Sequence, residues 1–214
     1  RIYRHTTPEE VQAWRDSPES KGINSAGESK LPPRCVRVEY NGGTIHRPNR
    51  TITKEEEVKL SMSSQSPKEI AVKLSELKAL KPSSSNPDVF VIGSDQVLDL
   101  QGKLFNKANN RGEAVEQLRT LSGQEHTLIT STVIAKNNSI VWRYLNESKM
   151  KMRALSEEMI QSYLAEASDE ILNIVGVYAI EKEGIKLFES IDGDIFSIQG
   201  ISMLPLTQFL WNNN

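Results

Sequence analysis

An apolar run that leads into a glycine and an acidic residue constrains the fold of this chain more than any other feature. Residues 89–92 are Val-Phe-Val-Ile, and Gly93, Ser94 and Asp95 follow them directly. Because the run lacks period-two alternation, we predict a central strand with both faces covered. Asp95 would then lie at the tip of this strand, where α/β enzymes place chemistry, or it would cap the following turn.

Length and charge limit the classes of protein to which the chain can belong. Its 214 residues suffice for one sizeable core or for a two-lobed domain around a cleft. With 26 basic and 28 acidic residues the formal net charge is −2, so we expect neither a nucleic-acid polymer nor a membrane as a partner. The single cysteine, Cys35, excludes an intramolecular disulfide framework, and no apolar run approaches the ~20 residues of a membrane span. Residues 1–5 lack an apolar signal core, so we expect a cytoplasmic protein.

The chain divides into an irregular first quarter and a regularly patterned remainder. Residues 8–16 follow a helix-start signal, residues 17–33 are rich in Ser, Gly, Pro and Lys without a period, and residues 35–40 alternate like a strand. We therefore assign residues 1–33 to an atypical N-terminal extension and residues 34–214 to a single domain.

Local signals in the patterned part predict helices interleaved with groups of strands. Ser66 and Pro67 open a helix that Pro82 should close, and residues 100–103 have the chemistry of a hairpin turn. Further helices are expected at residues 110–121, 156–166 and 204–211. Strands are expected at the apolar run that leads to Asp95 and at residues 127–135, 139–144, 177–180 and 185–188. Consecutive strands among helices favour an α/β protein with a mixed sheet.

Five short motifs follow one another along this part of the chain. They are residues 74–79 (Leu-Ser-Glu-Leu-Lys-Ala), 92–97 (Ile-Gly-Ser-Asp-Gln-Val), 104–107 (Leu-Phe-Asn-Lys), 121–126 (Leu-Ser-Gly-Gln-Glu-His) and 193–194 (Gly-Asp) before Gly200. In this order they resemble the Maf family of nucleoside triphosphate pyrophosphatases. The resemblance implies a Maf-like elongated mixed β-sheet with flanking helices and two lobes around a central cleft. It also implies hydrolysis of a nucleoside triphosphate to the monophosphate and pyrophosphate with Mg²⁺ or Mn²⁺, and it suggests a homodimer.

Within this resemblance, Asp95 and Lys107 stand at the catalytic positions. Asp95 resembles the family's catalytic acid/base, and a carboxylate is a natural hard ligand for Mg²⁺. Lys107 follows the predicted hairpin, where its ammonium group could reach a phosphate oxygen across the cleft. A lone loop lysine is otherwise a solvated residue.

Further polar residues have both a functional and a structural interpretation. Lys78 matches the lysine of the family's Leu-Ala-x-x-Lys-Ala pattern, which implies that it faces phosphate, although a lysine late in a helix is otherwise solvated. Glu56 or Glu57, in the acidic run of residues 55–57, stands where the family carries Asp-x-Asp-Glu and would ligate the metal; such a run is otherwise a solvated face. His126 is either a general acid or a side chain that satisfies a backbone group.

Two positions concern the base of the nucleotide. Gln96 follows the catalytic Asp, where the pyrimidine-selective branch of the family usually has Thr, and Glu181 stands where that branch usually has Gln. Both residues resemble the 7-methyl-GTP branch. A carboxylate can accept the paired N–H donors of a guanine edge, and methylation makes this base cationic. Glu181 is otherwise an exposed turn residue.

The phosphate-binding loop of the family, Ser-x-Ser-Pro-Arg-Arg, is altered. Its candidate, residues 25–34, follows no apolar strand, and Pro32 and Pro33 cannot lie inside a helix. Arg34 or Lys30 could substitute as the cation. Two functions therefore stay open. The first is a pyrophosphatase that removes noncanonical or surplus nucleotides, with a preference for 7-methyl-GTP. The second is a catalytically impaired nucleotide-binding or cell-division interaction protein, which the resemblance links to septum formation.

Overall fold

The computed structural model describes residues 39–40, 43–44, 53 and 66–213. By its internal contacts the chain divides into two compact units, Arg1–Thr51 and Ile52–Asn214. Arg34, Glu56 and Glu57, together with the helix expected at residues 8–16, lie outside the described residues.

A short antiparallel pair is described in the first unit. Strand β1 (Glu39–Tyr40) pairs with β2 (Gly43–Thr44), with Glu39 opposite Thr44 and Tyr40 opposite Gly43. This pairing confirms the end of the strand that we predicted at residues 35–40.

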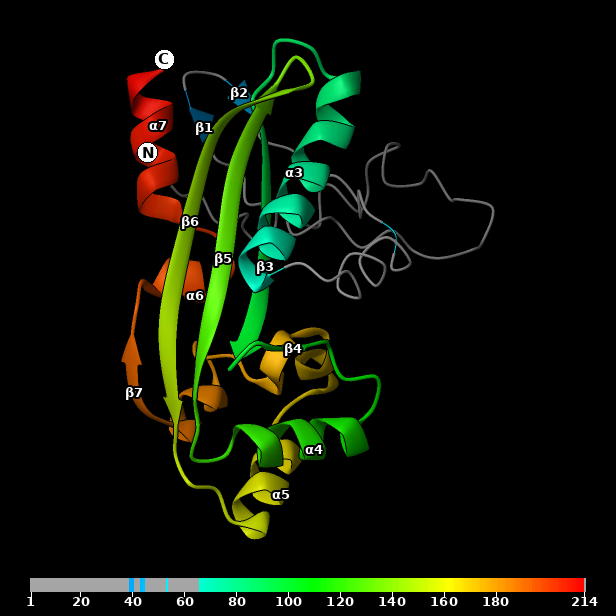
Figure 1. Cartoon of the computed structure of the whole chain (residues 1–214), viewed down its shortest axis with the longest axis vertical. Coiled ribbons are helices and arrows are strands. Elements are labelled where there is room, and N and C mark those ends of the chain that lie inside the picture. The colour runs from blue at the N-terminus through cyan, green and yellow to red at the C-terminus, as the bar shows by residue number, and fades with distance from the viewer. Residues whose placement is uncertain (1–38, 41–42, 45–52, 54–65, 214) are drawn as a thin grey trace, which may run out of the picture. The chain divides into compact units, whose positions relative to one another are not determined.

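The second unit is built on a five-stranded sheet in the order β4-β3-β5-β6-β7. All four pairings between these described strands are antiparallel, and β5 and β6 form the longest ladder (Figure 1). The helix-and-sheet class and a Maf-like fold are confirmed, with antiparallel pairing throughout the described strands. The strands are β3 (Val91–Leu100), β4 (Lys103–Phe105), β5 (Glu125–Lys136), β6 (Ser139–Met152) and β7 (Phe188–Asp192).

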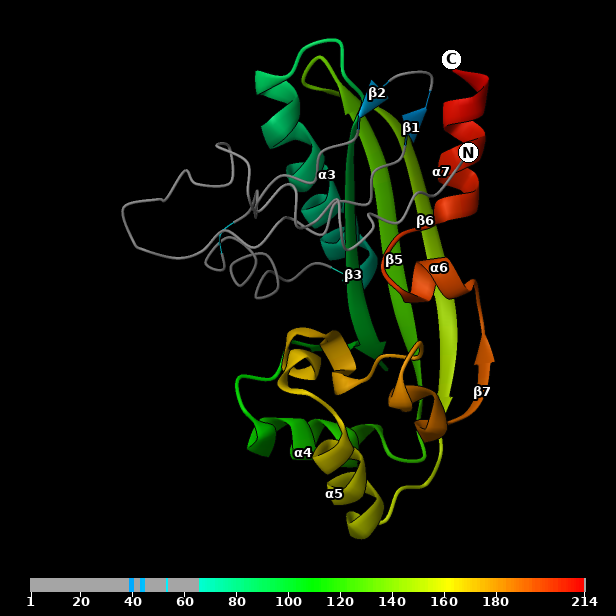
Figure 2. The ribbon, with the colours of Figure 1, turned by 180° about the vertical axis from the view of Figure 1, so that it is seen from behind.

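Helices cover both faces and one end of the sheet. Helix α3 packs on one face, whereas α6 and α7 lie on the other, as the two opposite views show (Figures 1 and 2). At the end of the sheet, α4 and α5 pack together with short 3-10 turns. The α-helices are α3 (Pro67–Ser85), α4 (Arg111–Leu121), α5 (Glu157–Glu166), α6 (Ile195–Ile198) and α7 (Met203–Asn212); the 3-10 turns are η2 (Asp169–Asn173), η3 (Val175–Val177) and η4 (Glu183–Leu187).

Helix α3 begins as its sequence predicts but ends later. Ser66 and Glu69 form a reciprocal capping box, and Pro67 occupies the first helical position. Pro82 was expected to close the helix, and this expectation was wrong, because the helix continues to Ser85. Only the last turn lies beyond Pro82. There Asn86 Nδ2 donates to the Pro82 carbonyl at 2.7 Å, so one side chain satisfies a carbonyl group near the end of the helix.

Two tight hairpins fix the register of the sheet. Gln101 (φ 54°) and Gly102 (φ 85°) connect β3 to β4, and Asn137 (φ 51°) and Asn138 (φ 57°) connect β5 to β6. Two successive positive φ angles match the right-handed twist of the flanking strands. The hairpin that we predicted at residues 100–103 is confirmed.

The strands predicted at residues 177–180 and 185–188 were wrong. The chain forms the turns η3 and η4 here, and the strand β7 begins only at Phe188. A short apolar run has the same pattern whether it is a strand or an irregular buried segment. Gly176 has a φ of 79° and Val177 a φ of 60°, which interrupts an extended backbone. The buried Val177 and Tyr178 instead fill the core around α4 and α5.

Three hydrophobic clusters stabilise the described part of the second unit, and the two larger ones lie at different places. The larger lies at the end of the sheet and joins residues of α4, α5 and β7 to Leu98, Leu128 and Met150. The smaller lies between α3 and the sheet and includes Ile70 and Val97. No helix within the described ranges is long and apolar enough to cross a bilayer.

Candidate active site

The alternation of β3 directs its side chains to opposite faces of the sheet. Asp95 contacts α3 through Lys78, and Val97 packs against α3 residues, so these odd-numbered positions share the α3 face. Strand β3 lies between β4 and β5, but β4 pairs only with residues 98–100, so around Asp95 the described neighbour of β3 is β5 alone, and the predicted central place holds only at the end of the strand. We expected Asp95 at the tip of the strand, and this expectation was wrong. Asp95 lies near the middle of β3, where it pairs with Ser131 of β5. The pairing of β3 with β5 continues through Ser94, Asp95 and Gln96, because the side chain of each of these polar residues has a hydrogen-bond partner.

An ion pair joins Asp95 to α3. Lys78 Nζ donates to Asp95 Oδ1, and the side chains are 28% and 13% exposed, respectively. Lys78 lies four residues after Leu74, so it extends from the sheet-facing side of the helix. Partial exclusion of water strengthens the attraction between the two charges relative to a pair on the open surface. The structure therefore brings together two of the residues that the sequence assigned to phosphate chemistry.

Buried hydroxyl groups lie beside this pair. Ser131, opposite Asp95, has its Oγ 2.7 Å from Ser75 Oγ, and Ser75 Oγ donates to the Val72 carbonyl at 2.8 Å. Thr130, Ser131 and Thr132 are consecutive and at most 1% exposed. Our reading of the sequence did not single out these residues. Three hydroxyls in a row inside the otherwise apolar run of residues 128–135 were the signal that could have revealed them.

Gln96 lies on the other face of the sheet. Its Nε2 is 2.8 Å from Thr130 Oγ1, 2.9 Å from the Ser197 carbonyl and 3.1 Å from the Ile198 carbonyl. These acceptors belong to β5 and α6, so the amide of Gln96 is engaged away from the side that carries Asp95 and Lys78.

Lys107 and Glu181 are both exposed and lie on irregular segments. Lys107 follows β4, which runs antiparallel to β3, so the chain turns back in the direction of Asp95 before it enters α4. Glu181 lies in the turn between η3 and η4. Within the described part of the chain, neither side chain forms an ion pair or hydrogen bond with Asp95 or Lys78.

The described residues supply a limited set of metal ligands. No cluster of three or more His, Cys, Asp or Glu side chains with metal-binding geometry occurs among them. Mg²⁺ is usually held by one or two carboxylates together with water and substrate phosphates, rather than by a complete protein cage. A single carboxylate at Asp95 fits that mode of binding.

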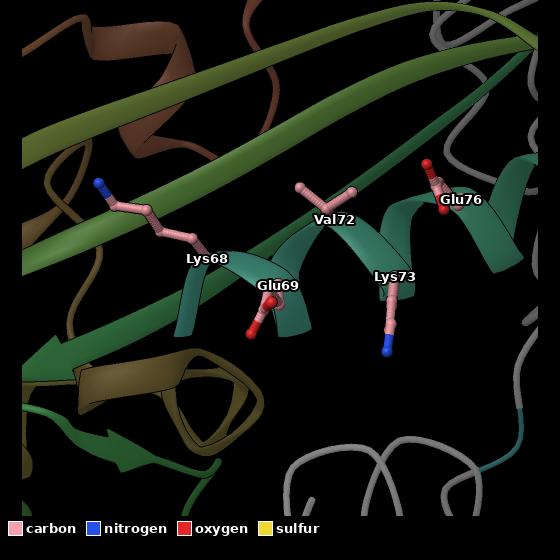
Figure 3. Close-up of a pocket in the computed structure, with 5 residues that line it drawn as sticks. All are labelled: Lys68, Glu69, Val72, Lys73 and Glu76. Carbon is pink, nitrogen blue, oxygen red and sulfur yellow. The ribbon is translucent and has the colours of Figure 1, made fainter. Parts of the chain in front are cut away.

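A hollow of about 260 Å³ lies along α3, but it is separate from the ion pair. Neither Asp95 nor Lys78 contributes to its lining, and the described residues that do all belong to the first half of α3 (Figure 3). One of these residues, Lys68, is paired with Glu147 of β6 at 2.7 Å. The lining residues are Lys68, Glu69, Val72, Lys73 and Glu76.

His126 belongs to the core and not to the surface of the site. The side chain is 1% exposed, and its Nε2 lies 2.7 Å from Tyr178 Oη, so its partner is a side chain and not a backbone group. The centroid of its imidazole ring lies 6.0 Å from the centroid of the Phe188 ring. Burial lowers the pKa of His126 from 6.5 to about 4, so the imidazole is neutral near pH 7.

We expect His126→Phe to remove a pH-dependent part of the stability. The unfolded histidine gains a proton below pH 6.5, whereas the folded one does so only near pH 4. The free energy of unfolding of the wild type should therefore fall as the pH decreases through this interval, by up to about 3 kcal/mol. Urea denaturation of both proteins between about pH 7.5 and about pH 4.5 measures the difference. Parallel curves would contradict this assignment.

Residues 40–213 match the Maf-like protein family, and the chain belongs to this family. Among its relatives, the nucleoside triphosphate pyrophosphatase of Nitrobacter hamburgensis is 42% identical over 200 residues, which cover 94% of this chain and 96% of that protein. A match of this length includes part of the first 33 residues. The 7-methyl-GTP pyrophosphatase of Bartonella quintana is 45% identical over 157 residues, 73% of this chain and 76% of that protein. The nucleoside triphosphate pyrophosphatase of Ruegeria pomeroyi is 42% identical over 158 residues, 73% of this chain and 79% of that protein.

Proposed function

We propose that this chain is a hydrolase that cleaves the α–β phosphoanhydride of noncanonical or surplus nucleoside triphosphates, releasing the monophosphate and pyrophosphate. The names of its relatives support this proposal. The observation that carries it is the ion pair between Asp95 and Lys78, which holds a carboxylate and an ammonium group together on the α3 face of the sheet.

Asp95 and Lys78 have complementary tasks in this chemistry. The carboxylate of Asp95 would accept a proton from the attacking water, or orient that water, as a general base. Lys78 would donate to a phosphate oxygen, where its charge offsets the negative charge that develops on the leaving pyrophosphate. Because Lys78 already contacts Asp95, a phosphate that binds Lys78 is also close to the base.

Other residues would complete the site around the triphosphate. We propose Lys107 as a second cation, because its segment runs back toward Asp95 after β4. Arg34 would serve as the cation of the altered phosphate loop. Glu56 or Glu57 would add a carboxylate to that of Asp95 for Mg²⁺ or Mn²⁺. When bound, the divalent ion would supply positive charge opposite the phosphate oxygens.

We propose 7-methyl-GTP as the favoured substrate, with Glu181 as the residue that recognises its base. The exposed position of Glu181 leaves its carboxylate accessible to a ligand. A carboxylate can accept two N–H groups from the guanine edge and is attracted to the cationic methylated base. A homodimer in the cytoplasm, with no nucleic-acid polymer as partner, is the setting that we propose.

The experiment measures pyrophosphate release from 7-methyl-GTP, UTP and dTTP with Mg²⁺ or Mn²⁺. We expect turnover with the highest kcat/KM for 7-methyl-GTP. Glu181→Gln should lower this preference about tenfold or more, because Gln offers one acceptor oxygen and no charge to the cationic base.

The neighbouring Glu183→Gln is the matched control, since Glu183 is also exposed and lies in the following turn η4. Its substrate ratios should equal those of the wild type. Unchanged ratios in Glu181→Gln would remove the reason for preferring the methylated purine. Absence of turnover on every nucleotide would leave the nucleotide-binding or cell-division interaction protein as the remaining function.

A further inference from the structure

The backbone on both sides of Lys107 is fastened to helix α4. Before it, the Asn106 carbonyl accepts from Gln117 Nε2 at 2.8 Å. After it, the backbone N of Asn109 donates to Glu113 Oε2 at 2.9 Å. The side chain of Asn109 adds contacts to the same carboxylate, with its Nδ2 2.9 Å from Oε2 and 3.2 Å from Oε1. Glu113 and Gln117 lie one helical turn apart on α4, so the two attachments share one support.

The part of α4 that carries these contacts is itself anchored to its surroundings. Arg111, the first residue of the helix, donates from Nε to Asp169 Oδ1 at 2.9 Å and from Nη2 to the Ala167 carbonyl at 3.1 Å. Ala108, the residue that follows Lys107, is 7% exposed and belongs to the large hydrophobic cluster at the end of the sheet. Packing and hydrogen bonds therefore fix the point at which the Lys107 side chain leaves the backbone.

The side chain of Lys107, by contrast, is exposed and has no ion pair or hydrogen bond with any other residue that the structure describes. Lys107 lies two residues beyond the last pair of the ladder between β3 and β4, and Asp95 lies three residues beyond the same pair on the other strand. A cation with a fixed backbone and a free ammonium group loses less conformational freedom when an anion binds than a cation on an unattached loop. The arrangement suits a residue that receives the charged tail of a nucleotide.

We propose that Glu113 is a positioning residue, which holds the segment of residues 106–109 through Asn109 so that the ammonium group of Lys107 meets the phosphate groups of the substrate. Gln117 supports the other end of the segment, and neither residue touches the nucleotide. The proposal rests on the proposed function, because it gives Lys107 the role of the second cation. The competing interpretation is that Glu113, in the first turn of α4, only stabilises the helix.

Alanine substitutions in two backgrounds separate these interpretations. In the wild-type background we expect Glu113→Ala to lower kcat/KM about tenfold for 7-methyl-GTP, UTP and dTTP alike, because a displaced cation is misaligned for every triphosphate. In the Lys107→Ala background the same substitution should change kcat/KM by less than about twofold, since no ammonium group is left to position. Equal losses in both backgrounds would overturn the proposal, and so would a wild-type kcat/KM in Lys107→Ala.

Two further variants test whether the charge of α4, rather than the attachment of Asn109, determines the activity. Glu113→Gln keeps an oxygen that can accept from the backbone N of Asn109, so it should retain kcat/KM within about twofold of the wild type. Glu116→Ala is the matched control, because Glu116 is an exposed glutamate of the same helix and pairs with Arg119. It should also retain the wild-type kcat/KM. A loss in either variant as large as that in Glu113→Ala would show an effect of helix charge and would refute the positioning role.

Hydrogen exchange tests the attachment without any assay of activity. The backbone amide of Asn109 should exchange at least about tenfold faster in Glu113→Ala than in the wild type, because Glu113 is its acceptor. In Glu116→Ala the same amide should exchange at the wild-type rate. An unchanged rate in Glu113→Ala would overturn the attachment. If the wild type turns over no nucleotide, the proposed function fails and with it the role of Lys107, whereas the exchange rates still decide whether Glu113 holds the segment.

Discussion

Asp95→Asn is expected to lower kcat for pyrophosphate release by about 10²-fold to 10⁴-fold, the range that a positioned general base contributes. The substitution removes the proton acceptor and the negative charge that would attract a divalent ion and that pairs with Lys78, and it changes the size of the side chain very little. Initial rates at saturating 7-methyl-GTP measure the effect, and circular dichroism establishes that the variant is folded.

Asp99→Asn is the control for this substitution. Asp99 lies four residues later on β3, on the same face, and its Oδ1 accepts from the Gly102 backbone N at 2.7 Å in the hairpin. An asparagine oxygen can keep this bond, so Asp99→Asn should retain the wild-type kcat. If the activity of Asp95→Asn were close to that of Asp99→Asn, Asp95 would have no catalytic role.

Gly93→Ala is expected to reduce the free energy of unfolding by about 3 kcal/mol or more, because the backbone of α3 lies against this glycine. A Cβ atom here would lie 2.2 Å from the Ser75 carbonyl oxygen and 2.7 Å from the Ala79 backbone N. Neither atom can move without shifting the helix that carries Lys78. We therefore expect lower catalytic activity as well, and urea denaturation measures the loss of stability.

Gly102→Ala separates steric overlap from backbone conformation. Gly102 has a φ of 85°, and a Cβ atom there would meet nothing within 4 Å. Its replacement by alanine should therefore lower the free energy of unfolding only through the unfavourable backbone conformation, by about 1 kcal/mol. We expect no loss of activity. Equal destabilisation by the two substitutions would mean that α3 can move away from Gly93 at no cost.

The sequence predicted the parts of the fold whose signals are local. The cap at Ser66 and Pro67 determined where α3 begins, and paired positive-φ residues such as Gln101 and Gly102 determined a hairpin. The segments around Tyr178 and Leu187 could not be predicted, because their apolar residues are buried by contacts with α4 and α5 that are distant in the sequence.

Only part of the candidate site could be predicted from the sequence. Asp95 and Lys78 were each assigned to phosphate chemistry, and the structure brings them into contact. The sequence could not predict their direct pairing, because this depends on how closely α3 approaches β3 at Gly93. It also could not predict that Gln96 faces α6, since the length of β3 beyond Asp95 was not known. The roles of Lys107 and Glu181 stay predictions.

The ion pair between Lys78 and Asp95 spans only 17 positions along the chain. Closing so short a loop costs little entropy, since this cost grows only with the logarithm of loop length. The charged pair belongs to a neighbouring helix and strand, and it can assemble early during folding, before the distant ends of the sheet meet.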